Sequence, residues 1–141
     1  GFVKAGLERI GIPFTHVVER DYRNLETNYH AIDAYLVTSR EEGGPRAILE
    51  AMATGVPIVS TRVGQAVDLI IHENNGWLSD VEDAEALAYW TELAVGKEYS
   101  RSDMQSRGRV TAEENCWAAQ MPLWRNFFSE IVVSTDLTNY K

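Results

Sequence analysis

The alternation of short apolar runs with helical patterns limits this chain to a small group of folds. Apolar runs at residues 34–38 and 57–61 flank a segment whose apolar residues have helical spacing. Pro45 fits the first turn of that helix, where a missing N–H costs nothing, and Gly55 fits the left-handed residue just past its end. Strands that alternate with helices in this way indicate βα units. The sequence therefore predicts an α/β fold with a Rossmann-like parallel sheet and flanking helices.

The remaining elements follow the same alternation. We expect further helices at residues 3–10, 24–30, 65–71 and 83–94, and short strands at residues 14–18 and 76–78. Asp83 has the side chain and the position of a helix N-cap. Thr111-Ala112-Glu113-Glu114 has the spacing of a capping box and predicts a long helix that runs to about Ile131. We assign residues 1–133 to one domain and residues 134–141 to a flexible tail.

The charge and the cysteine content of the chain argue against several classes of partner. Thirteen basic against 21 acidic residues give a net charge of −8 without any basic run, so nucleic acid is not expected to bind. A single cysteine, Cys116, cannot form an internal disulfide, which is usual in a reducing compartment and favours a cytoplasmic location. No apolar run approaches the roughly 18 residues that span a bilayer. Because the chain begins without Met and inside a helical pattern, we expect a piece of a longer protein.

The segment at residues 41–57 combines two acidic side chains with a glycine-rich helix start. Glu42 and Glu50 stand eight positions apart around Gly43, Gly44 and a proline. Ligands of an open α/β sheet bind outside the carboxyl ends of the strands, and the preceding strand delivers this segment to that edge. The free N–H groups at a helix start favour an anion, and glycines let a ligand approach the backbone. A sugar nucleotide, which carries both phosphates and hydroxyls, fits such a site.

The same charged residues also have simple structural explanations. Glu42 beside a helix start could complement the helix dipole, which is worth about 0.3–1 kcal/mol. Arg46 and Glu50, four residues apart, could form a surface ion pair worth about 0.2–0.5 kcal/mol. Neither explanation accounts for the coincidence of loop glycines and two carboxylates at one edge of the sheet. For Arg46 the preferred interpretation is a solvated helix face or the pair with Glu50, and contact with a phosphate is the alternative.

Metal sites and common catalytic motifs are not expected. His16, His30 and His72 lack the spacing of metal ligands, and no Asp-x-Asp sequence is present. The chain also lacks the Gly-x-Ser-x-Gly and Gly-x-Gly-x-x-Gly motifs of hydrolases and dinucleotide-binding proteins. We therefore assign no catalytic residue from these motifs.

The last predicted helix carries an apolar stripe with three- and four-residue spacing. It consists of Trp117, Met121, Trp124, Phe128 and Ile131. The preferred interpretation is that the stripe packs against the sheet of this domain. The alternative is that part of it docks on a further domain. In that case the chain exposes an apolar patch that would favour self-association.

Residues 34–88 resemble the C-terminal, donor-binding domain of the GT-B-fold glycosyltransferases, specifically the large retaining family often called family four. The family signature of two glutamates separated by seven residues is met by Glu42 and Glu50. It is followed here by Ala-Met-Ala at residues 51–53 and Gly-Val-Pro at residues 55–57. The resemblance implies the C-terminal half of a GT-B fold that is truncated at its N-terminus. The acceptor-binding N-terminal domain and two early strands would then be missing.

The resemblance also implies roles for the residues of the signature. Glu42, Gly43, Gly44 and Pro45 would contact the donor sugar, and Glu50 would hold the ribose hydroxyls of a UDP- or GDP-sugar. The enzyme would be a hexosyltransferase that transfers the sugar with retention to an acceptor in polysaccharide or glycolipid synthesis. It would need no metal, no cofactor and no dedicated catalytic side chain. It would act in the cytoplasm, at the inner membrane face if the missing domain binds there, and this chain alone would be inactive.

The sequence departs from the family pattern at the phosphate site. The family's diphosphate-binding Arg and Lys lie on segments that would precede residue 1, and Arg40, Arg46 and Arg62 occupy none of those positions. Gln65 stands where the family often has a second glycine. Two other functions stay open. One is a nucleotide-binding module that needs a partner chain, and the other is a GT-B-like sugar-nucleotide 2-epimerase.

Overall fold

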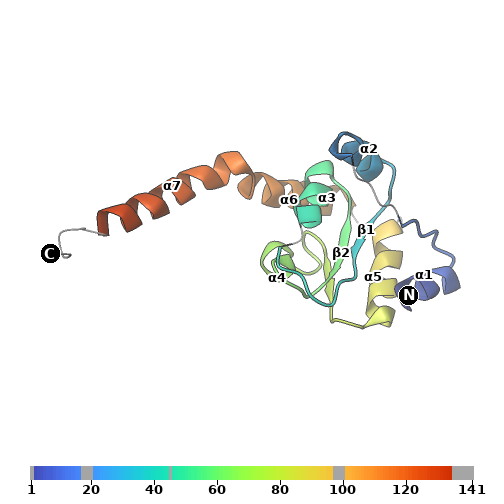
Figure 1. Cartoon of the computed structure of the whole chain (residues 1–141). Coiled ribbons are helices and arrows are strands. Elements are labelled where there is room, and N and C mark those ends of the chain that lie inside the picture. The colour runs from blue at the N-terminus through green and yellow to red at the C-terminus, as the bar shows by residue number, and fades with distance from the viewer. Residues whose placement is uncertain (1, 17–20, 45, 97–100, 135–141) are drawn as a thin grey trace.

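The computed structural model of this chain describes residues 2–16, 21–44, 46–96 and 101–134. The elements follow one another as α1 (Phe2–Arg9), η1 (Tyr22–Asn24), α2 (Leu25–His30), β1 (Tyr35–Val37), α3 (Arg46–Thr54), β2 (Ile58–Thr61), α4 (Ala66–Leu69), β3 (Trp77–Ser79), α5 (Ala84–Val95), α6 (Arg101–Glu114) and α7 (Trp117–Ser134). Figure 1 shows helices gathered around a small sheet, from which α7 projects. Each strand is followed by a helix, as the sequence predicts.

The three strands form one parallel sheet in the order β1-β2-β3. Tyr35 lies opposite Ile58 in the first ladder, and Val59 lies opposite Trp77 in the second. Every residue of β2 is buried, as expected for a central strand whose two faces are covered by helices. The prediction of an α/β fold with a parallel sheet is therefore confirmed.

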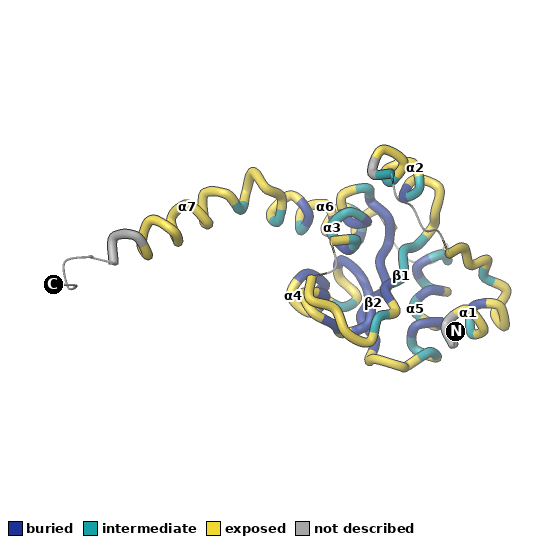
Figure 2. Tube along the Cα trace, viewed as in Figure 1, coloured by how far each residue is buried: buried dark blue, intermediate teal, exposed yellow. Residues whose placement is uncertain are grey.

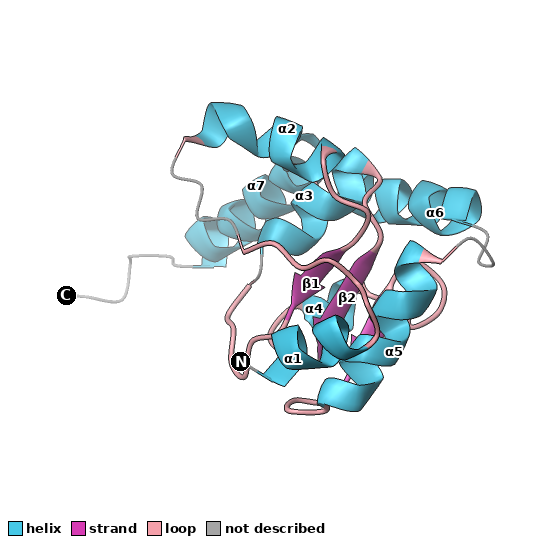
Figure 3. Ribbon diagram, turned by 90° about the vertical axis from the view of Figure 1, so that its right-hand side faces the viewer, coloured by secondary structure: helices cyan, strands magenta, loops and turns pink. Residues whose placement is uncertain are grey.

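Helices cover both faces of this sheet. Ile58 packs into a core formed with α3 and α4, whereas its neighbour Val59 packs into a second core with Trp77 and α5. Successive strand residues point to opposite faces, so one strand supplies both cores. Figure 3 shows α1 and α5 together in front of the strands, with α3 beyond them. The sheet therefore holds its loops on a scaffold that is packed from both sides.

The ends of α3 and α5 agree with the sequence signals. Gly55 ends α3 with a φ of +76°, the left-handed conformation that glycine adopts without strain. The Asp83 carboxylate caps α5 by accepting a hydrogen bond of 2.9 Å from the Ala86 N–H. Pro45, expected in the first turn of α3, lies outside the described residues. Both helices are consequently placed where local sequence chemistry predicts them.

Two predicted elements are wrong. No strand forms at Phe14–His16, and the other two residues of that prediction lie outside the described ranges. Thr111 does not open a helix, because it lies in the last turns of α6 and donates from its hydroxyl to the Arg107 carbonyl oxygen. The chain instead breaks at residues 115–116 before α7 begins. The exposed thiol of Cys116 stands in this break.

The apolar stripe of α7 does not pack against the sheet. Trp117 is 73% exposed and Phe128 is 57% exposed, and Figure 2 shows α7 exposed along most of its length. The expectation that the stripe covers the sheet of this domain is therefore wrong. It is α6 that packs against α3, and α7 projects away beyond it. Ser134 ends α7, and residues 135–141 of the expected tail lie outside the described part of the chain. None of the described helices is long and apolar enough to cross a membrane.

Candidate functional site

The loop that follows β1 is tied to the end of β2. The Thr61 hydroxyl, on the last residue of β2, donates a hydrogen bond of 2.7 Å to the Ser39 carbonyl oxygen. The Ser39 hydroxyl in turn donates to Glu42 Oε1 at 2.8 Å. Glu42 itself is exposed, so its second carboxylate oxygen faces solvent at the carboxyl edge of the sheet. Two strand ends thus orient a carboxylate that can accept hydrogen bonds from a ligand.

A second loop, at residues 62–65, lies against the first one. Gly64 has a φ of +46°, and a Cβ on it would collide with the carbonyl oxygens of Glu42 and Gly43. The Gln65 side chain lies beside Gly44, where its amide oxygen would be 3.0 Å from an added Cβ. The loops after β1 and β2 are therefore in direct contact. Together they form the edge where ligands of parallel α/β sheets bind.

The glycines of the first loop leave its backbone accessible. Gly43 is exposed, and a Cβ on it would meet no atom within 4 Å. Gly44 is also exposed and has only the Gln65 side chain beside it. A ligand can approach this backbone without displacing packed side chains. Pro45, the third member of the predicted cradle, lies outside the described residues.

Glu50 lies one turn inside α3, half-buried, and its partner comes from another element. The Tyr29 hydroxyl, on α2, donates a hydrogen bond of 3.0 Å to Glu50 Oε2. The pair that the sequence suggested between Arg46 and Glu50 does not form in the described part of the chain, and Arg46 is exposed. Sequence reasoning missed Tyr29. Its place in the expected helix at residues 24–30 was the only available signal, and that helix gave no reason to pair it with Glu50.

The two carboxylates act on one phenol. Burial raises the pKa of Tyr35, the nearby Glu50 carboxylate raises it further, and Glu42 adds a smaller effect, while Tyr29 opposes part of the shift. The rings of Tyr29 and Tyr35 are 5.4 Å apart between their centroids. Tyr29 thus contacts both the Glu50 carboxylate and the Tyr35 ring.

Two of the basic residues near this edge are paired with acids of the loop after β3. Arg40 Nε lies 2.7 Å from Glu82 Oε1, and Arg62 Nε lies 3.4 Å from Asp80 Oδ1. All four side chains are largely exposed, so each pair contributes little to stability, about 0–1 kcal/mol. The described residues contain no cluster of three His, Cys, Asp or Glu side chains with the arrangement of a metal site. The charges of Arg40 and Arg62 are thus already balanced by the protein, whereas Arg46 forms no ion pair within the described residues.

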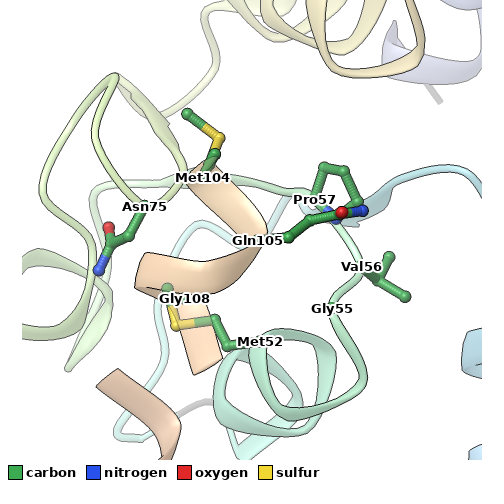
Figure 4. Close-up of a pocket in the computed structure, with 8 residues that line it drawn as sticks. All are labelled: Met52, Gly55, Val56, Pro57, Asn75, Met104, Gln105 and Gly108. Carbon is green, nitrogen blue, oxygen red and sulfur yellow. The ribbon is translucent and has the colours of Figure 1, made fainter. Parts of the chain in front are cut away.

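Two cavities lie away from the carboxylates. The first, of about 10 Å³, holds at most a single water and is lined by residues of α3 and α6 and by their neighbours, as Figure 4 shows. The second, of about 190 Å³, is lined by Tyr29, His30, Ile32, Asp33, Thr54, Gly55, Val56, Pro57 and Gln105. Both touch the start of β2, at the opposite end of the sheet from Glu42. Neither is lined by Glu42 or Glu50, although Tyr29, which bonds Glu50, lines the second.

Comparison with known proteins matches most of the chain to one family. The profile of the Glycosyl transferases group 1 matches residues 10–111. N-acetyl-alpha-D-glucosaminyl L-malate synthase of Bacillus anthracis is 34% identical over 108 residues, which are 77% of this chain and 26% of that protein. Other relatives are named for the biosynthesis of amylovoran, lipopolysaccharide core and capsular polysaccharide. The chain spans about a quarter of the length of this synthase and of one other curated relative.

Solved structures show the same fold. The C-terminal domain of a glycosyl transferase group 1 family protein from Francisella tularensis matches with a TM-score of 0.64 and 21% identity, over 79% of this chain and 59% of that one. Anabaena HepE in complex with UDP-glucose matches with a TM-score of 0.69 and 22% identity, over 87% of this chain and 35% of that one. At such identities the likeness concerns the fold alone. The match over residues 10–111 and this fold show that the chain belongs to the glycosyl transferases group 1 family, with the architecture of the C-terminal half of a GT-B glycosyltransferase.

Proposed function

We propose that this chain forms the donor-binding part of a retaining glycosyltransferase that uses a nucleoside-diphosphate sugar. The observation that carries the proposal is the exposed Glu42, oriented by Ser39, beside a loop with an accessible glycine backbone that leads into the helix of Glu50. The two carboxylates offer acceptors for hydroxyls, and the free backbone N–H groups at the helix start offer donors for phosphate. The name of the HepE complex, which contains UDP-glucose, supports a ligand of this class.

Each residue of the signature has a distinct part in this proposal. Glu50 accepts hydrogen bonds from the ribose hydroxyls, and Glu42 accepts them from hydroxyls of the donor sugar. The backbone N–H groups of Gly43 and Gly44 face the sugar and the diphosphate at the start of α3. Charge-assisted bonds to a diol require ionised acceptors, so both carboxylates act in the deprotonated form. Arg46, exposed in the first turn of α3, is a candidate partner for a phosphate oxygen.

The chemistry proposed for the donor needs no base from this chain. The bond between the anomeric carbon and the phosphate oxygen breaks, and a bond from that carbon to the acceptor oxygen forms on the same face. The departing phosphate takes the proton of the acceptor hydroxyl. Stabilising the negative charge on the diphosphate is then the main task of the protein, for which the helix start of α3 is suited. The proposal includes no metal and no cofactor besides the donor sugar.

The whole protein would include an acceptor-binding domain, because Glu42, Gly43 and Gly44 lie at an exposed surface. Relatives named for capsular polysaccharide and lipopolysaccharide core synthesis support a glycan or glycolipid as the acceptor. The proposed location is the cytoplasm, or its membrane face if the further domain binds there. The open surface equally favours a second candidate: a nucleotide-binding module that completes its cleft with a partner chain. Sugar transfer by this chain alone would exclude the module, whereas nucleotide binding without transfer agrees with both.

Calorimetric titration of the 141-residue chain with UDP and with GDP tests the proposed site. We expect one of the two nucleotides to bind, and Glu50→Ala to weaken that binding by about tenfold or more, because a charge-assisted hydrogen bond is worth roughly 1.5–3 kcal/mol. Glu92→Ala, an exposed glutamate on α5, is the matched control and should leave the affinity unchanged. Equal losses for both variants, or no heat with either nucleotide, would contradict the proposal.

A further inference from the structure

The hydrogen bond between Tyr29 and Glu50 links α2 to the proposed ribose site. Tyr29 is buried, with only 6% of its surface exposed, and it is the one buried residue of the six-residue helix α2. Its hydroxyl lies 3.0 Å from Glu50 Oε2 and 3.5 Å from the Ala47 carbonyl oxygen. A phenol has a single proton to donate. The shorter of the two contacts, to the carboxylate, is therefore the one that the hydroxyl makes.

A tyrosine with a purely structural role could satisfy its hydroxyl on the backbone alone. Here it uses a charged side chain that is itself only half-buried, although the Ala47 carbonyl oxygen is close by. Within the described residues, no other donor reaches the Glu50 carboxylate. Oε1 is consequently left with its full capacity to accept from a ligand, while Oε2 retains one more lone pair.

The phenol is also a dependable donor. Burial raises the pKa of Tyr29, and its neighbours Tyr35 and Glu50 raise it further. The hydroxyl therefore keeps its proton to higher pH than an exposed tyrosine does, and it is a donor at neutral pH. Its ring is held in place by Tyr35, with the centroids 5.4 Å apart. A fixed donor on a packed ring restricts the torsions of the flexible Glu50 side chain before any ligand arrives.

We infer that Tyr29 positions Glu50 for the ribose diol, so that this tyrosine contributes to ribose selectivity without touching the ligand. The inference rests on the proposed function, because it assigns Glu50 to the ribose. An unrestrained glutamate loses rotamer freedom when it binds a ligand, and a carboxylate that is already oriented loses less. Tyr29 is thus a positioning residue, whose effect should appear only with ligands that carry the hydroxyls which Glu50 contacts.

The test compares Tyr29→Phe with the unaltered chain by calorimetry, using UDP and GDP beside their 2′,3′-dideoxy counterparts. The unaltered chain should prefer the ribonucleotide to the dideoxy form. Tyr29→Phe should lose about fivefold in affinity for the ribonucleotide, as expected for one hydrogen bond, and should bind the dideoxy form unchanged. Tyr89→Phe, an exposed tyrosine on α5, is the matched control and should retain the full preference.

The possible outcomes separate this inference from the proposed function. If the unaltered chain prefers the ribonucleotide and Tyr29→Phe keeps that preference, the positioning role is wrong and the donor site stands. If Tyr29→Phe weakens both forms equally, the tyrosine supports the fold and not the ribose contact, which also overturns the inference. If the unaltered chain binds neither nucleotide, or binds both forms equally, the assignment of Glu50 to the ribose fails, and the inference fails with it.

Discussion

Gly64 joins two loops that come from different strands. Its φ of +46° is one that side-chain-bearing residues rarely adopt, and its Cα faces the carbonyl oxygens of Glu42 and Gly43. Because Gly64 carries only a hydrogen where another residue has a Cβ, the loop after β2 can pack directly against the loop that carries Glu42. At the scale of one residue, the backbone conformation at position 64 shapes the candidate site as much as the charged side chains do.

Gly64→Ala should lower the free energy of unfolding by about 2 kcal/mol or more, since left-handed strain alone costs about 1–3 kcal/mol and the new methyl group would also collide with the backbone. Urea denaturation of the purified variant measures the change. Gly43→Ala is the matched control, because its methyl group would enter open space and should change stability by no more than about 0.5 kcal/mol. Similar stability of the two variants would show that the loops can separate without cost.

At the scale of elements, local chemistry predicts some helices well and others not at all. The limits of α3 and the cap of α5 follow from Gly55 and Asp83, so their sequences were sufficient. The beginning of α6 was missed because the helix is mostly polar and contains Gly108, a residue that weakens a helix prediction. The structure explains this glycine, because α6 packs closely against Met52 of α3 at that position. Packing between elements distant in sequence overrides local propensity there.

The candidate site likewise contains residues that the local sequence predicts and partners that it does not. Glu42 and Glu50 could be selected because they lie on one loop and the helix that follows it. The partners that orient them could not, because Tyr29 is 21 residues from Glu50 and Thr61 is 22 residues from Ser39. Contacts of this kind depend on the register of the parallel strands and on where α2 docks. Neither leaves a local pattern in the sequence.

The tyrosine pair that joins α2 to β1 makes stability depend on alkaline pH. The pKa of Tyr29 and that of Tyr35 are both raised by burial and by their surroundings, above the value of about 10 in an unfolded chain. The folded chain then keeps these protons longer than the unfolded one. The contribution to stability is complete below about pH 10 and is lost as the pH rises beyond it.

Thermal unfolding between pH 8 and pH 11 checks this expectation. The melting temperature of the unaltered chain should fall more steeply above pH 10 than that of the double variant Tyr29→Phe/Tyr35→Phe, which lacks both phenols. Tyr89→Phe, altered at an exposed position, should follow the unaltered chain. Parallel curves for all three proteins would show that the buried phenols do not couple folding to pH.

At the scale of the whole molecule, α7 is the helix whose apolar surface is left uncovered by the described part of the chain. Large apolar side chains are exposed along it, including Trp117, Leu123, Trp124, Phe127 and Phe128. Trp124 stacks on Phe128 with the ring centroids 5.9 Å apart, so the two form a continuous apolar surface on one helix. Exposed apolar patches of this kind mark surfaces that bind another protein or another part of the same one.

Replacing this surface should change association and leave folding intact. We expect the unaltered chain to self-associate with rising concentration, and Trp124→Glu/Phe128→Glu to shift it toward the monomer in sedimentation velocity. The melting temperature should change by no more than a few degrees, because both residues are exposed. Val67→Glu, at an exposed apolar position on α4, is the control and should leave association unchanged. A monomeric unaltered chain at every concentration would contradict the expectation.

The break between α6 and α7 places the single cysteine of the chain at a useful position. Cys116 is exposed and stands between α6, which is packed on α3, and α7, which projects from the rest of the domain. A fluorophore or spin label attached there would sense the orientation of α7 without competition from another thiol. The protein therefore carries a natural attachment point for spectroscopy, at the joint whose angle decides where its aromatic surface is presented.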